Sequence, residues 1–86
     1  MPTLSVFYGI TIMMQYNDHA PPHFHARYGE FWGAFGIDPV RKLESDLPPQ
    51  AEKLVRTWAK MHQGELLNSW EAAMNRQKLG RIDPLR

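Results

Sequence analysis

Two alternating segments separated by Gly29 and Glu30 constrain the fold of this chain more than any other feature. Residues 23–28 and 31–36 each alternate in character, and successive side chains of a strand point to opposite faces. A two-residue loop that begins with glycine fits a tight antiparallel hairpin and fixes its register. The expected pairs are Tyr28 with Phe31, Arg27 with Trp32, Ala26 with Gly33, His25 with Ala34, Phe24 with Phe35 and His23 with Gly36.

The other residues extend this hairpin into a single α+β domain that spans residues 1–86. Residues 7–16 alternate as a further strand, in which we expect Gln15 to pair with His25 and Met13 with Arg27. Residues 40–44 fit a short fourth strand, so the antiparallel sheet has three to four strands within residues 5–44. The core face of the first strand is expected to carry Tyr8, Ile10, Ile12, Met14 and Tyr16.

The C-terminal half has the composition of a helix, from the prolines at 48–49 to about residue 76. Its apolar residues form two stripes whose phase changes at Gly64, so we expect a kinked helix or a helix pair that covers one face of the sheet. Trp58 and Trp70 lie on these stripes and are expected in the core, with His62 packed beside them. Residues 77–86 form a polar tail that we expect to be only partly ordered.

Composition narrows the functional classes. The 86 residues include no cysteine, which excludes disulfides and thiolate metal sites. A formal net charge of +1 does not by itself argue for a nucleic-acid partner. No apolar run approaches the roughly 18 residues of a membrane span. The N-terminus also lacks a signal-peptide pattern, so we expect a cytoplasmic protein that does not enter a membrane.

Candidate functional residues gather in HAPPHFHARYGE, residues 19–30. His23 and His25 share one strand face, opposite small residues that leave space above them. One interpretation is a metal site, in which His19 or Asp18 closes over the two strand histidines from the preceding loop. Imidazole ligands together with a carboxylate or water suit zinc, nickel, copper or iron.

Two further interpretations stay open, and with them the question of whether the protein is an enzyme. In an RNA-binding protein or metal-independent ribonuclease, His23 and His25 would act as general base and acid, while Arg27 held a phosphate. Trp32 would stack on a base. In the third interpretation, this sheet face binds a partner protein or a second copy of the chain. The residues of that surface are Met13, Gln15, Arg27 and Trp32.

A family resemblance favours the partner interpretation. The segment VFYGITIMMQYNDHAPPHFHARYGEF, residues 6–31, resembles the opening of a bacterial and archaeal family known as domain of unknown function 4160, which carries the motif HxPPHFHxRYGE. The likeness continues at LP (47–48), at residues 54–62 and at ELLNSWEAA (65–73), and it departs at residues 38–40, where relatives have a longer turn. The resemblance implies an adjacent gene for a small protein of the domain of unknown function 2442 type. It therefore implies a component of a toxin–antitoxin-like pair that acts by binding its partner.

Overall fold

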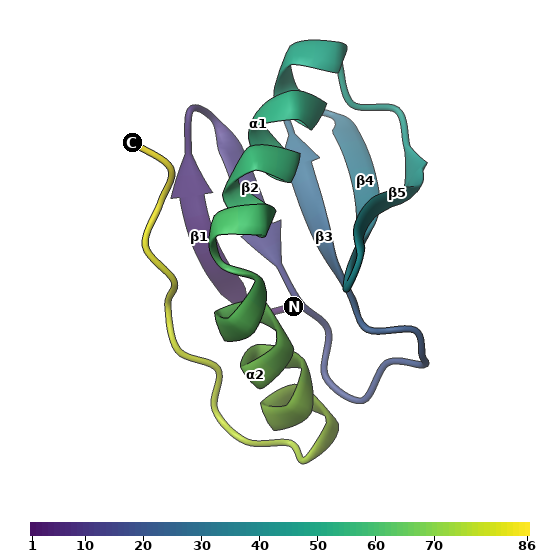
Figure 1. Cartoon of the computed structure of the whole chain (residues 1–86), viewed down its shortest axis with the longest axis vertical. Coiled ribbons are helices and arrows are strands. Elements are labelled where there is room, and N and C mark those ends of the chain that lie inside the picture. The colour runs from purple at the N-terminus through teal and green to yellow at the C-terminus, as the bar shows by residue number, and fades with distance from the viewer.

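The computed structural model describes residues 1–86, which form an antiparallel sheet of five strands with two helices on one side (Figure 1). The strands lie in the sheet in chain order, so each strand pairs with its neighbour in the sequence. The expected α+β class is confirmed, with five strands where three or four were expected. The elements are β1 (Thr3–Phe7), β2 (Ile10–Met13), β3 (His23–Tyr28), β4 (Phe31–Ile37), β5 (Val40–Ser45), α1 (Pro49–Met61) and α2 (Gln63–Met74).

The hairpin of β3 and β4 has the expected register in all six pairs, from Tyr28 with Phe31 to His23 with Gly36. Gly29 in its turn has a φ of 60°, a conformation that glycine adopts without a steric penalty. On the core face, the rings of Phe24 and Phe35 stack with their centroids 5.7 Å apart. Strand alternation therefore directs the histidines of β3 to the opposite face.

The fifth strand results from a turn at Tyr8 and Gly9. The expectation of one strand over residues 7–16 was wrong, because β1 and β2 form a hairpin. Tyr8 and Gly9 have φ values of 48° and 79°, and two successive left-handed residues make the turn that matches the twist of paired strands. Tyrosine rarely has a positive φ, so the residue pattern does not mark this turn. As a consequence Tyr8 and Tyr16 are exposed and do not join the core.

The register between β2 and β3 differs from the expectation by two residues. Met13 pairs with His25, and Thr11 pairs with Arg27. The strand β2 ends at Met13, and residues 14–22 all belong to the connection to β3. A shift of two residues keeps each side chain on its face. Gln15, however, leaves the sheet and is exposed in the connection.

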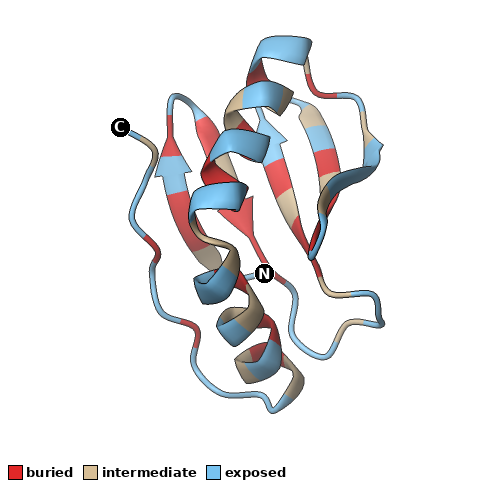
Figure 2. Cartoon of the chain, in the orientation of Figure 1, coloured by how far each residue is buried: buried red, intermediate tan, exposed pale blue.

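The helices meet at His62 and cover the core face of the sheet, so the expected helix pair is confirmed (Figure 1). Figure 2 shows mostly exposed residues on the visible side of α1 and buried residues in the strands behind it. Trp58 is fully buried with its ring edge-on to Phe24, and Trp70 is also buried. The ring of His62 packs 5.3 Å from that of Trp58. Neither helix has the length and apolar character needed to cross a membrane.

The C-terminal residues 77–86 run back alongside β1 (Figure 1). The expectation of a merely polar tail was wrong, because Leu79 and Ile82 are buried in the core. The backbone N–H of Ile82 donates to the carbonyl of Leu4 at 2.7 Å, and the indole N–H of Trp58 donates to the carbonyl of Asp83 at 2.8 Å. The tail thus follows the outer edge of β1 and completes the core beneath α1.

Candidate functional site

The connection from β2 to β3 is tied to the rest of the molecule at both ends. The backbone N–H of Asn17 donates to the carbonyl of Ala73 in α2 at 3.2 Å, and Asn17 has a φ of 53°. At the other end, the N–H of Ile37 donates to the carbonyl of Pro22 at 3.3 Å. These two hydrogen bonds make the connection turn back toward β3. Asp18 therefore lies beside the first residue of that strand.

His23 is almost completely enclosed, with 9% of its surface exposed. Its Nδ1 lies 2.7 Å from the carbonyl oxygen of Pro21, and its Nε2 lies 3.0 Å from Oδ2 of Asp18. A carbonyl oxygen can only accept, so Nδ1 carries a hydrogen and donates it. The ring also packs against Trp70 of α2, with 5.2 Å between the centroids. His23 is held on every side by groups of the protein itself.

His25 stands next to His23 with its ring edge-on and 5.2 Å away. The Nδ1 atom of His25 is buried and has no hydrogen-bond partner. One side-chain nitrogen or oxygen from each of Asp18, His23 and His25 lies within 4.8 Å of the other two. These three side chains are called the Asp–His–His cluster below. Of the two residues expected to close over the strand histidines, the structure brings Asp18 to the cluster.

Burial and charge set the ionisation of this cluster. Burial on its own raises the pKa of Asp18, but the N–H of His19 and the imidazoles of His23 and His19 outweigh it and lower the pKa below the ordinary 3.8. Burial and the neighbouring His23 lower the pKa of His25 below its ordinary 6.5, against a weaker opposing effect of Asp18. At neutral pH the cluster therefore holds an ionised carboxylate and an uncharged His25.

His19 lies at the edge of the cluster and outside its set of converging atoms. Its side chain is 92% exposed, and its Nδ1 lies 3.1 Å from Oδ1 of Asp18. The ring centroid is 6.2 Å from that of His23. The three histidines are thus not equivalent: one is exposed on the loop, and two are built into the strand.

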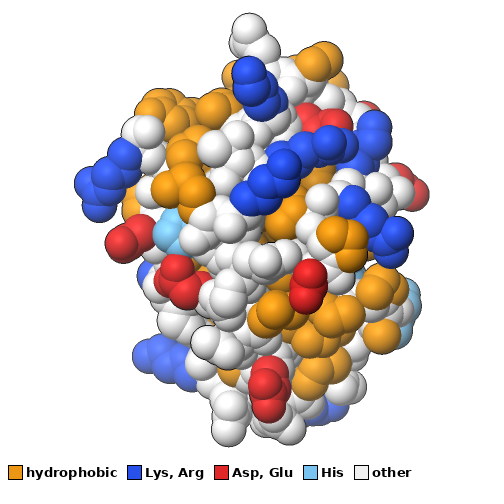
Figure 3. All heavy atoms as spheres, viewed as in Figure 1, with side chains coloured by type: hydrophobic (Ala, Val, Ile, Leu, Met, Phe, Trp, Pro, Cys, Tyr) orange, Lys and Arg blue, Asp and Glu red, His pale blue; other side chains and the backbone are white.

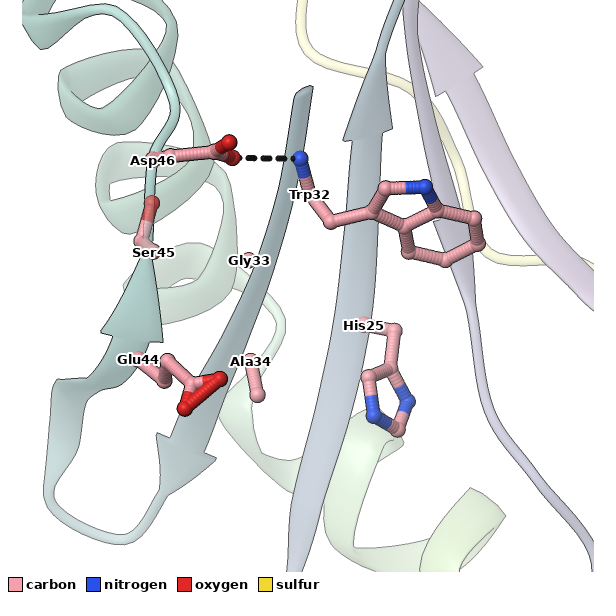
Figure 4. A pocket seen from close by; sticks show the side chains of 7 residues that line it. All are labelled: His25, Trp32, Gly33, Ala34, Glu44, Ser45 and Asp46. Carbon is pink, nitrogen blue, oxygen red and sulfur yellow. Dashed lines mark hydrogen bonds between the residues drawn. The ribbon is translucent and has the colours of Figure 1, made fainter. Parts of the chain in front are cut away.

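A hollow of about 410 Å³ opens beside His25 on the face of the sheet away from the helices (Figure 4). Figure 4 shows Glu44 and His25 on either side of Ala34, with the Trp32 indole above His25. The backbone N–H of Trp32 donates to Oδ1 of Asp46 at 2.8 Å. The lining residues are His25, Trp32, Gly33, Ala34, Glu44, Ser45 and Asp46.

The residues predicted to form one surface are divided between different environments. The guanidinium carbon of Arg27 lies 5.7 Å from the centroid of the Trp32 ring, so this expected pair is present. Met13 is on the same sheet face but is only 8% exposed, and Gln15 lies in the connection. The exposed part of the face therefore lies around Trp32 and the hollow.

Sequence reasoning missed Trp70 beside His23 and the two carboxylates of the hollow, Glu44 and Asp46. The helical stripe places Trp70 in the core, but it does not say which end of the sheet that part of α2 covers. Alternation along β5 from its turn would put Leu43 beside Ala34, but an irregularity between Ala34 and Phe35 shifts the register and puts Glu44 there, two strands from His25. Asp46 follows β5, so no local pattern marks either carboxylate.

The fold and cluster define an α+β domain with five antiparallel strands, a helix pair on one face, and an Asp–His–His cluster at the start of the central strand. The chain belongs to the family described as domain of unknown function (DUF4160), whose profile matches residues 9–71. The match begins at the turn before β2 and ends within α2, so it includes the cluster and the hollow. No curated protein and no solved structure was found to match the chain.

Proposed function

We propose that this protein is one member of a cytosolic, toxin–antitoxin-like pair and acts by binding its partner protein through the sheet face opposite the helices. The observation that carries the proposal is Trp32, which is 42% exposed beside the hollow. Tryptophan and arginine next to a pocket are typical of the few residues that dominate the energy of protein interfaces. The family resemblance suggests the partner, a small protein encoded by the adjacent gene.

The charges around the hollow suggest what that partner presents. Glu44 and Asp46 flank the hollow, and neither forms an ion pair within the chain, whereas Glu52 is paired with Lys42 and Arg56. Carboxylates without a cationic partner beside an aromatic ring complement a Lys or Arg side chain. We therefore expect the partner to insert a basic side chain into the hollow and to pack an apolar one on Trp32.

The same charges favour a protein over RNA as the ligand. The two carboxylates repel a phosphate backbone, whereas Arg27 beside Trp32 attracts one. His23 uses both ring nitrogens for contacts within the protein, so His25 would have to act without it. An RNA-directed activity of His23, His25 and Arg27 remains the alternative.

The test is binding to the protein encoded by the adjacent gene, measured by co-purification and then by titration calorimetry. Trp32→Ala is expected to weaken binding roughly 30-fold, the effect of an interface hot spot. Glu44→Lys should weaken it as well, through charge repulsion. Lys60→Ala is the matched control, since it changes an exposed residue of α1 on the helix side of the molecule, where Figure 3 shows Lys and Arg side chains gathering.

Absence of a complex, or a complex that tolerates both sheet-face variants, would contradict the proposal. Self-association through Trp32 in the absence of the partner would point to a homodimer instead. For the RNA alternative the readout is growth arrest on expression of this chain alone. Arrest that disappears with His25→Ala would support the alternative, and no arrest would count against it.

A further inference from the structure

We propose that the Asp–His–His cluster binds a divalent transition-metal ion, with Asp18, His23 and His25 as the protein ligands. This inference does not depend on the proposed function, although His25 belongs to the cluster and also lines the hollow of the partner face. Of the two loop residues that the sequence left open as ligands, His19 and Asp18, it selects Asp18.

The first support is the direction of the His23 ring. Because Nδ1 donates its hydrogen to the carbonyl of Pro21, Nε2 is the ring nitrogen left to hold a cation, and it faces an oxygen of Asp18 at 3.0 Å. A carboxylate oxygen and an imidazole nitrogen that face each other in this way share a cation, which is either a proton or a metal ion. A carbonyl oxygen that fixes the far nitrogen of an imidazole is also one of the common supports of a metal-bound histidine.

The second support distinguishes a metal ion from a proton. A proton on Nε2 of His23 would give Asp18 and His23 a hydrogen bond but would leave His25 without a partner. Nδ1 of His25 is buried without a partner, although buried polar atoms in proteins are almost always paired. A metal ion held by the ring nitrogen of His25 that lies in the cluster gives all three side chains a partner at once.

The chemistry of the donors selects the ion. Two imidazoles and one carboxylate suit zinc and its neighbours in the first transition row, whereas magnesium and calcium prefer oxygen ligands alone. Bonds of about 2.0–2.1 Å separate tetrahedral ligand atoms by roughly 3.4 Å, so the atoms now within 4.8 Å draw closer on binding. Three protein ligands leave one position for water.

The experiment uses the full chain without an affinity tag, stripped with a chelator and titrated with zinc by calorimetry. We expect a single ion per chain, and cobalt in place of zinc should give the visible absorption of a tetrahedral site. Asp18→Asn and His25→Ala should each lower zinc affinity about 100-fold or more. Asp18→Asn keeps the size of the side chain, and circular dichroism establishes that both variants are folded.

His19→Ala is the control, because it removes an exposed histidine of the same segment that lies outside the cluster. It should leave zinc affinity within a few-fold of the original. Stoichiometric binding that survives in both cluster variants would overturn the proposal, as would the absence of binding above the level of a surface histidine. A loss with His19→Ala equal to that with Asp18→Asn would overturn the ligand assignment.

Discussion

Nε2 of His23 lies 3.0 Å from Oδ2 of Asp18, across the junction between the loop and the first residue of β3. His23 and Asp18 are nearly enclosed, with 10% and 13% of their side-chain surface exposed, so little water competes for the contact. Since Nδ1 of His23 is held by the carbonyl of Pro21, the loop contacts both ring nitrogens. The contact therefore fixes the connection onto the sheet and positions the cluster.

Removal of the Asp18 carboxylate should destabilise the fold, because it leaves Nε2 of the enclosed His23 without a partner. We expect Asp18→Ala to lower the free energy of unfolding by about 1–3 kcal/mol. Asp18→Asn should cost less, since its amide can still form a hydrogen bond. Urea unfolding measures both effects, and Asp83→Ala, at an exposed position, is the control. Equal stability of Asp18→Ala and Asp83→Ala would show that the contact contributes nothing.

The free energy of unfolding should fall with acidification over a pH range set by the pKa of His25. Its pKa is lowered in the folded state by burial and by His23, so the unfolded chain binds a proton first as the pH falls. The contribution of His25 is complete above the ordinary pKa of 6.5 and is lost as the pH falls from there through the folded pKa. The free energy of unfolding of the metal-free protein, measured at a series of pH values, should therefore fall less at acid pH in His25→Gln than in the original. Identical pH profiles of the two proteins would show that protonation of His25 does not cause the loss of stability.

Two glycines should respond to alanine in opposite directions. Gly9 has a φ of 79°, and an added Cβ would lie 3.3 Å from the Tyr28 ring, so Gly9→Ala should cost about 1–2 kcal/mol. Gly64 lies in the first turn of α2, and an added Cβ there would meet no atom within 4 Å, so Gly64→Ala should stabilise by about 0.5–1 kcal/mol. Thermal unfolding of the two variants separates these effects, and a lower unfolding temperature of Gly64→Ala would contradict the expected gain.

The C-terminal tail should contribute to stability like a core element. The side chain of Ile82 is buried, and its backbone N–H donates a hydrogen bond to the carbonyl of Leu4 that holds it in place. Ile82→Ala should therefore lower the free energy of unfolding by about 2–4 kcal/mol. Lys78→Ala, at an exposed position of the same segment, should change it by no more than about 0.5 kcal/mol. Denaturant titration measures both, and a tail that only frays would give similar values for the two variants.

The parts of the fold that were predictable are those decided by neighbours in the chain. The loop at Gly29 and Glu30 determines the whole β3–β4 register, because two residues leave one way to close the hairpin. The apolar stripes similarly determine the helix pair. The turn at Tyr8 was missed because its backbone conformation is unfavourable for tyrosine, and the tight packing of Tyr28 against Gly9 is a contact between distant residues.

For the candidate site, the sequence by itself determined that His23 and His25 share a strand face and that Arg27 lies beside Trp32, since alternation and register need no distant contact. Only the tertiary structure decided that Asp18 joins the two histidines while His19 is exposed. That choice depends on hydrogen bonds from the connection to α2 and β4, which form between residues far apart in the chain. No local pattern records such contacts, because they exist only once the helices have packed on the sheet.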